Sequence, residues 1–342
     1  MKHSAFRDSC YLPAMRIVFA GTPEYAVASL RALASLAPAH ELAGVVTQPD
    51  RPRGRKGEPA PPEVKVAALE LGIPGERILQ PESINRPEAL AALRELKPDL
   101  LCVVAYGGLL KDEALALPAR YALNAHGSLL PRHRGASPIQ AAILHGDEQT
   151  GVCIMKMVRA LDAGPVLWWR AIPLGPGETA GSLHDRLADL SGIGWIEAVR
   201  LIEAGKERFE PQDDARATYA PKLEKESGAL DWTREAMYLE RHVRAMSPWP
   251  GAWTTVRDAG GLAPRPLRIE RAAVASAKPP AGATPGTAWF ERSGERGRWF
   301  AACGSGALEL LEVQQSGGKT MGVEPYLRGA GRAYAEGARL GA

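Results

Sequence analysis

The sequence MRIVFAGTPEYAVASL, residues 15–30, joins an apolar run to a tight turn and then to a helical pattern. The run from Met15 to Ala20 predicts a buried strand, and Gly21 allows the chain to turn sharply after it. Thr22 and Pro23 are typical of a helix start, and Thr22 is expected to cap the helix with its side chain. The stretch therefore predicts the first strand–helix unit of an α/β domain.

The same alternation continues along the chain. Apolar runs at Leu42–Thr47 and Asp99–Ala105 predict further strands, the second of the kind that is covered on both faces. Strands that alternate with helices favour a Rossmann-like, mostly parallel sheet. The turn at Gly21 lacks the G-x-G-x-x-G pattern, so a dinucleotide is not the expected ligand. Strands are also expected at 122–126, 152–157 and 166–172, and helices at 63–71, 87–96, 137–144, 182–190 and 195–204.

The pattern is lost over residues 206–221, where polar and charged residues predict a linker. Residues 15–205 are therefore expected to form the Rossmann-like catalytic domain. Short strand-like runs broken by Gly and Pro predict a smaller, OB-like β-barrel domain over residues 222–330. Residues 1–14 are expected to be a disordered leader, and residues 331–342 a tail.

The composition is typical of a globular protein, with 45% hydrophobic and 24% charged residues among 342. A net charge of +3 is too small to indicate nucleic-acid binding without a local basic patch. The four cysteines form no C-x-x-C pair, which argues against a zinc site or a disulfide framework. Neither a membrane span nor a signal peptide is expected, so the sequence favours a cytoplasmic protein. A metal is not expected either.

Polar residues cluster at the end of one predicted strand, in the segment NAHGSLLP, residues 124–131. Asn124 and His126 share one face of the strand, at the sheet edge where ligands bind in open α/β sheets. By itself this pattern favours a histidine held by backbone groups, and Asp162 in the turn LDAGP favours plain turn chemistry. Together the three side chains suit attack by an amine on an activated acyl group. The neighbouring His133 is expected to be a surface residue rather than a catalyst.

Seven segments resemble, in order, the methionyl-tRNA formyltransferases of the folate-dependent formyltransferase family, over roughly Met15 to Leu327. The resemblance implies a catalytic trio of Asn124, His126 and Asp162. It also implies 10-formyltetrahydrofolate as formyl donor and initiator methionyl-tRNA as acceptor. The segments are FAGTPEYA, VVTQPDRPRGRKG, VVAYGGLL, NAHGSLLPRHRGASPIQ, GVCIMKM, LDAGPVL and SPWPGAW.

The resemblance further implies binding residues, a tRNA-binding role for the C-terminal domain and a monomeric enzyme. Ala160 and Ala163 depart from the glycine and threonine that the family often has beside the aspartate. A basic loop, Asp50–Glu58, would approach the tRNA acceptor stem. The implied folate-binding residues are Ser128, Leu129, Leu130, Pro131, Tyr106 and Gly107, and the implied tRNA contacts are Arg51, Arg53, Arg55 and Lys56.

Two alternatives remain open at this point. One is a folate-dependent formyltransferase for an amino sugar or a purine precursor. A purine enzyme would be expected to lack the second domain, and a sugar enzyme would not need the basic loop. The other alternative is a folate- or nucleotide-binding module without catalysis, which would be expected to lack one member of the trio.

Overall fold

The computed structural model of the chain describes residues 14–53, 57–257, 263–293, 296–334 and 338–341. The chain divides into two compact units. The first comprises the residues up to Arg134, Gly151–Ile172 and Asp185–Tyr219, and the second comprises Gly135–Thr150, Pro173–His184 and the chain from Ala220 onward. The predicted leader, residues 1–14, lies outside the described residues except for Ala14.

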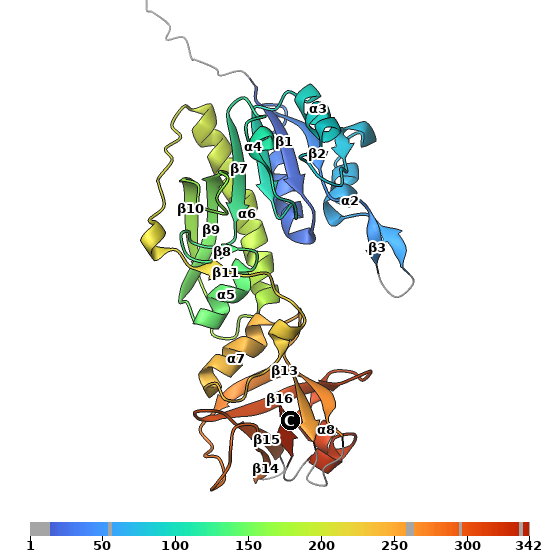
Figure 1. The fold of residues 1–342 in the computed structure, drawn as a ribbon, viewed down its shortest axis with the longest axis vertical. Coiled ribbons are helices and arrows are strands. Elements are labelled where there is room, and N and C mark those ends of the chain that lie inside the picture. The colour runs from blue at the N-terminus through green and yellow to red at the C-terminus, as the bar shows by residue number, and fades with distance from the viewer. Residues whose placement is uncertain (1–13, 54–56, 258–262, 294–295, 335–337, 342) are drawn as a thin grey trace, which may run out of the picture. The chain divides into compact units, whose positions relative to one another are not determined.

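The central sheet has seven strands in the order β10-β9-β7-β6-β1-β2-β5 (Figure 1). Neighbours from β5 to β7 run parallel, whereas β9 runs antiparallel to β7. The prediction of a Rossmann-like, mostly parallel sheet is thus confirmed. The strands are β1 (Arg16–Gly21), β2 (Glu41–Val46), β5 (Ile78–Leu79), β6 (Leu100–Val104), β7 (Tyr121–His126), β9 (Gln149–Lys156) and β10 (Val166–Pro173).

Both faces of this sheet are covered. All five residues of β6 are buried, and successive side chains of a strand point to opposite faces, so neither face of β6 is open to water. Two short antiparallel pairs, β3 (Arg51–Arg53) with β4 (Glu58–Ala60) and β8 (Arg134–Gly135) with β11 (Tyr219–Ala220), lie outside the central sheet. The helices of this part of the chain are η1 (Glu24–Ala26), α1 (Val27–Ala34), α2 (Glu63–Glu70), η2 (Gly75–Arg77), α3 (Pro87–Glu95), α4 (Asp112–Leu115), α5 (Pro138–His145), α6 (Ala180–Glu203) and η3 (Asp214–Arg216).

Two hydroxyl groups next to helix starts have partners far away in sequence, and for Thr22 this differs from the capping role that was expected. Thr22 does not cap the first helix; its Oγ1 donates to the carbonyl of Tyr106 at 2.7 Å and accepts from the N–H of Gln48 at 3.4 Å. Ser137 precedes α5 but makes no side-chain capping bond either, and its Oγ donates to the carbonyl of Pro221. In both cases the hydroxyl donates to a carbonyl far away in sequence.

The two helices predicted at 182–190 and 195–204 are one helix, α6, of 24 residues. No helix was expected over residues 191–194, which include Ser191, Gly192 and Gly194. Ser191 Oγ instead donates to the carbonyl of Leu187 within the helix at 2.8 Å. Gly194 lies against the ring of Trp168, and a Cβ atom there would come within 2.6 Å of it. The small residues therefore allow close packing and do not end the helix.

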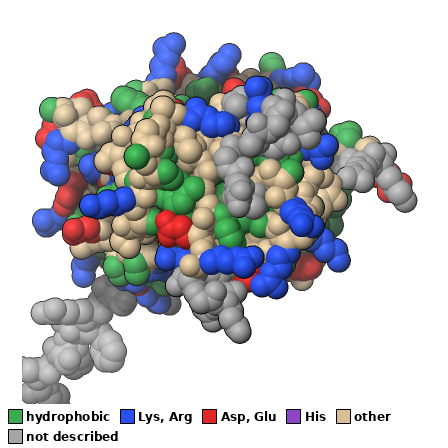
Figure 2. Space-filling view, turned by 90° about the horizontal axis from the view of Figure 1, so that it is seen from below, with side chains coloured by type: hydrophobic (Ala, Val, Ile, Leu, Met, Phe, Trp, Pro, Cys, Tyr) green, Lys and Arg blue, Asp and Glu red, His purple; other side chains and the backbone are tan. Residues whose placement is uncertain are grey.

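The second unit contains a curled antiparallel half-barrel with the strand order β14-β15-β16-β13-β12-β18, and β17 pairs with β16. This confirms the predicted β-rich C-terminal domain. Trp299 and Tyr326 fill its core and are almost fully buried. Figure 2 shows one end of the molecule, where Lys and Arg side chains lie around hydrophobic ones. The elements are η4 (Glu226–Gly228), α7 (Ala236–Ala245), β12 (Trp253–Arg257), β13 (Arg265–Ala275), β14 (Ala288–Ser293), β15 (Arg296–Ala302), β16 (Ala307–Gln315), β17 (Met321–Gly322), α8 (Val323–Arg328), η5 (Arg332–Tyr334) and β18 (Arg339–Leu340).

Two segments predicted to be irregular take part in the compact units. Residues 206–219, most of the predicted linker, belong to the first unit. Within the predicted tail 331–342, β18 pairs with β12 through Val256 and Leu340. The first segment is polar and the second is rich in Gly and Ala, so neither sequence shows that backbone pairing holds it. Over the described residues, no helix has the length and apolar character to cross a lipid bilayer.

Candidate active site

The end of β7 places Asn124 and His126 on one face of the sheet. Asn124 is paired with Val103 of β6 and Met155 of β9, and His126 with Cys153 of β9. Because residues two apart in a strand point the same way, the amide and the imidazole lie on the same side, as predicted. Asn124 is half-buried and His126 is buried.

His126 lies beside Asp162, which comes from the connection between β9 and β10. The distance from His126 Nδ1 to Asp162 Oδ2 is 3.6 Å, and both side chains are largely buried. Residues 36 positions apart in the numbering are thus brought to one place, as their chemistry predicted. The pair is slightly more open than a hydrogen bond, which leaves room for adjustment when a substrate binds.

The other ring nitrogen of His126 has a backbone partner. Nε2 lies 2.8 Å from the carbonyl oxygen of His133. A carbonyl oxygen only accepts hydrogen bonds, so Nε2 must carry a hydrogen atom. Nδ1 is consequently the nitrogen at which the ring gains or loses a proton, and it is the one that faces the Asp162 carboxylate.

His133 itself is not the surface residue that was expected. Its side chain is 2% exposed, and its φ of 57° lies in the left-handed region. Its N–H donates to Thr218 Oγ1 at 2.9 Å, which helps to hold the backbone there. No motif in the sequence indicates this role, because the backbone oxygen of any residue at position 133 could accept the bond. The flanking Arg132 and Arg134 suggested an exposed segment instead.

Asp162 occupies a tight loop with a left-handed backbone, since its φ is 50°. Asp tolerates this conformation better than most side chains. The loop closes through hydrogen bonds from Ala163 N to Ala160 O at 3.3 Å and from Lys156 N to Pro165 O at 2.9 Å. A cavity of about 450 Å³ lies beside it, lined by Arg134, Ala160, Leu161, Ala163, Asp214, Ala217 and Tyr219.

The cysteine beside His126 is not a nucleophile. Burial raises the pKa of the Cys153 thiol to about 12, with a backbone hydrogen bond from Leu130 opposing it only in part. A thiol with so high a pKa stays protonated near neutral pH. A covalent route through Cys153 is therefore disfavoured, and the imidazole, carboxylate and amide suit direct transfer of an acyl group to an amine.

The segment Ser128–Pro131 follows β7 directly. Ser128 Oγ donates to the carbonyl of Arg132 at 2.6 Å and so closes the turn. Leu130 packs against Cys153, Met155 and Val166, and the segment's other two residues are half-buried. The segment is therefore a fixed turn, and a ligand would meet its backbone and aliphatic side chains rather than the Ser128 hydroxyl.

Tyr106 and Gly107 follow β6, the parallel neighbour of β7, so they lie at the same edge of the sheet. The Tyr106 side chain is buried in the hydrophobic core, and only its backbone could contact a ligand. Gly107 and Gly108 are exposed, and Leu109 beyond them is 75% exposed. The exposed backbone of the two glycines, next to the exposed Leu109 side chain, could contact a flat ring system.

The basic loop begins after β2, whose end lies at this same edge because β2 is also parallel. Its beginning, β3, pairs antiparallel with β4, which starts at the last residue of the loop. The Arg51 side chain is exposed and lies 3.3 Å from Glu82. Arg53 is in β3, whereas Arg55 and Lys56 lie outside the described residues. A role of these cations in tRNA binding stays a prediction.

Comparison with known proteins gives the same picture along the whole chain. A family model described as Formyl transferase matches residues 15–199, and one described as Formyl transferase, C-terminal domain, matches residues 222–331. The methionyl-tRNA formyltransferase of Pseudomonas paraeruginosa is 44% identical over 96% of this chain and 100% of that protein. The enzyme of that name from Stenotrophomonas maltophilia is 46% identical over 92% of this chain and 97% of that protein.

Solved structures share the fold at lower identity. WlaRD, a sugar 3N-formyl transferase solved with dTDP and 5-N-formyl-THF, has a TM-score of 0.60 at 15% identity, covering 88% of this chain and 97% of its own. HypX from Aquifex aeolicus, solved with tetrahydrofolic acid, has a TM-score of 0.56 at 18% identity, covering 92% of this chain and 47% of its own.

Proposed function

This chain belongs to the formyl transferase family, and from this we propose that it transfers a formyl group from 10-formyltetrahydrofolate to the α-amino group of methionine on initiator methionyl-tRNA. The product is the N-formylmethionyl-tRNA used in translation initiation. The choice of methionyl-tRNA as the acceptor rests on one observation. Curated methionyl-tRNA formyltransferases are 42–46% identical to this chain over 92–96% of its length.

The catalytic residues in this proposal are Asn124, His126 and Asp162. The methionine nitrogen attacks the formyl carbon, a new C–N bond forms, and the bond from that carbon to the folate nitrogen breaks. The His126–Asp162 pair takes the proton that the amine loses and returns one to the leaving nitrogen. The side-chain N–H of Asn124 donates to the formyl oxygen as negative charge develops there. No covalent enzyme intermediate is needed.

We place the folate co-substrate at the shared edge of β6 and β7. The exposed backbone of Gly107 and Gly108, the exposed Leu109 and the turn Ser128–Pro131 support this position. Tyr106 would take part only through its backbone, because its side chain is buried. The co-substrate supplies the activated formyl group, and the residues named here orient it toward His126 and Asp162.

An amino sugar is the second candidate acceptor, because sugar N-formyltransferases share this fold. Their identity to this chain is only 13–15%, against more than 40% for the methionyl-tRNA enzymes. A purine precursor is disfavoured by the second unit, which such an enzyme would be expected to lack. A binding module without catalysis is disfavoured because all three residues of the trio are present.

The direct test is a formylation assay with the purified full-length chain. Initiator methionyl-tRNA and 10-formyltetrahydrofolate are supplied, the product is deacylated, and formylmethionine is measured. A dTDP-linked amino sugar serves as the competing acceptor in a parallel reaction. Formylmethionine is the expected product. Absence of formylmethionine would remove this function, and formylation of the sugar alone would favour the second candidate.

We propose that the basic loop binds the acceptor stem of the tRNA through Arg51, Arg53, Arg55 and Lys56. The Arg53→Ala/Arg55→Ala double variant should raise KM for tRNA and leave KM for folate unchanged. Losing two phosphate contacts should reduce the slope of log KM against log salt by about 2, because each contact releases roughly one counterion.

The matched control for this experiment is Arg31→Ala/Arg200→Ala. It removes two exposed arginines of the same unit, each paired with a glutamate. Measuring both double variants at several salt concentrations separates a local contact from the general effect of charge. Equal salt slopes in the two would contradict tRNA binding by the loop.

We further propose that residues 15–205 form the catalytic domain and that residues 222–330 help to bind tRNA. The second part carries exposed arginines such as Arg271 and Arg328. Because the acceptor is an aminoacylated tRNA, the enzyme would act in the cytoplasm, and it would act as a monomer.

A further inference from the structure

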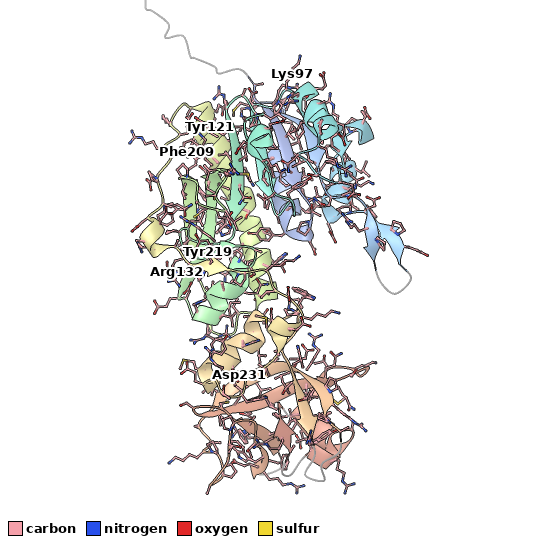
Figure 3. All side chains as sticks on the ribbon, in the orientation of Figure 1. Lys97, Tyr121, Arg132, Phe209, Tyr219 and Asp231 are labelled. Atoms are coloured by element: carbon pink, nitrogen blue, oxygen red, sulfur yellow. The ribbon has the colours of Figure 1, made fainter. Side chains whose placement is uncertain are left out.

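The segment after α6 packs against the first unit's sheet although its sequence predicted a linker. The rings of Phe209 and Tyr121 of β7 are 4.9 Å apart between centroids (Figure 3). Glu210 exchanges two backbone hydrogen bonds of 2.8 Å with Val166 of β10. These contacts fix the chain just before Gln212, the residue that reaches the loop of Asp162.

Gln212 holds that loop through two backbone carbonyls. Its Nε2 donates to the carbonyl of Asp162 at 2.8 Å and to the carbonyl of Gly164 at 2.7 Å. Both amide hydrogens are therefore used on the two sides of Ala163.

Arg134 determines which way the amide of Gln212 points. Its Nε and Nη2 donate to Gln212 Oε1 at 3.1 and 2.8 Å. Because arginine has no acceptor, the oxygen of the amide must face Arg134 and the NH₂ group must face the Asp162 loop. Arg134 is 3% exposed, and its charge is paired with Asp214 at 2.6 Å. Burial lowers the pKa of Arg134, but hydrogen bonds to Asp214 and Tyr219 outweigh burial and raise it.

The backbone conformation of the Asp162 loop requires stabilising contacts. The left-handed backbone at Asp162 is costly for a residue with a Cβ atom, so the loop by itself favours other conformations. The carboxylate must nevertheless stay near His126 Nδ1, now 3.6 Å away. A misplacement of about 1 Å of a catalytic group can cost about a hundredfold in rate.

We propose that Gln212, oriented by Arg134, is a positioning residue that holds the Asp162 loop in its catalytic conformation; this role rests on the proposed formyl transfer. Gln212 touches no reacting atom and acts only through the backbone on either side of Ala163. Residues 209–214 of the predicted linker are thus part of the framework that supports the Asp162 loop.

The first test compares Gln212→Met with Asp213→Ala. Met has nearly the length of Gln but no donor, whereas the Asp213 carboxylate accepts a hydrogen bond from Ala215 N at the start of η3. Gln212→Met should lower kcat about tenfold or more, with KM for folate and tRNA within about twofold of the original. Asp213→Ala should stay close to the original enzyme. A rise in KM without a fall in kcat would overturn the proposal.

The second test asks whether Gln212 acts through Asp162. In the Asp162→Asn background, Gln212→Met should lower the remaining rate by less than about twofold, because two residues that act as a unit are not additive. If the double variant lost the product of the two single-variant rate factors, Gln212 would act independently of Asp162, and the proposal would be overturned.

The third test needs no substrate. Hydrogen–deuterium exchange of the peptide containing Leu161–Gly164 should be faster in Gln212→Met than in the original protein, and unchanged in Asp213→Ala. Unchanged exchange in Gln212→Met would overturn the positioning role. If the original protein failed to formylate methionyl-tRNA but exchange was still faster in Gln212→Met, the positioning of the loop by Gln212 would be supported and the proposed function would be contradicted.

Discussion

Replacing His126 with alanine should lower the rate of formyl transfer by at least about a hundredfold, the usual scale for loss of general acid–base catalysis. Asp162→Asn should cost a similar factor. The reason is geometric: Nε2 is committed to the carbonyl of His133, so proton transfer depends on Nδ1 and on the carboxylate 3.6 Å from it. Neither residue can do the work of the other.

The measurement is single-turnover formylation with saturating methionyl-tRNA and folate. The double variant should be little slower than either single variant, because the two side chains form one proton-handling pair. Asp189→Asn is the matched control, since it neutralises an exposed carboxylate on α6 of the same unit. Near-normal turnover in Asp162→Asn or His126→Ala would show that the roles are misassigned.

The second large effect is expected from Gly164→Ala. A Cβ atom at this position would lie 1.8 Å from the carbonyl oxygen of Lys156, which is backbone and cannot rotate away. Relief of that clash has to move the connection between β9 and β10. Overpacking of this kind costs about 1–3 kcal/mol or more in unfolding free energy. Because Asp162 lies in this connection, activity should fall at least about tenfold even where the protein stays folded.

Gly75→Ala is the matched control, because no atom lies within 4 Å of the Cβ position there. Thermal unfolding and formylation should both be measured for the two variants. Gly164→Ala should unfold several degrees lower, on the scale of about 2–4 °C for each kcal/mol. If the two variants had the same unfolding temperature and the same activity, the tight contact would not matter.

Local patterns in the sequence were sufficient for the architecture. An apolar run followed by Gly21 and a helical pattern predicted β1 and α1, and the fully apolar β6 predicted a sheet covered on both faces. The chemistry of His126 and Asp162 predicted that the two side chains would meet. These features depend on burial and on side-chain type, which the sequence displays directly.

Long-range backbone contacts could not be predicted in this way. The Thr22 hydroxyl donates to a carbonyl 84 residues away, and it does not cap the helix that begins beside it. Polar composition over residues 206–221 suggested a linker, yet the segment is held by backbone bonds to β10 and by the amide of Gln212. Backbone groups are common to all residues, so no sequence motif indicates which of them will form a long-range hydrogen bond.

The partner of His126 Nε2 is a main-chain oxygen, and this affects how the site tolerates change over evolution. A codon change at position 133 replaces the imidazole but cannot delete the oxygen. Position 133 can therefore change among residues that accept its φ of 57°, such as glycine or asparagine, while the hydrogen atom on His126 Nε2 stays in place. The tautomer of His126 is thus set by the path of the backbone, and sequence variability at position 133 would conceal the importance of that position.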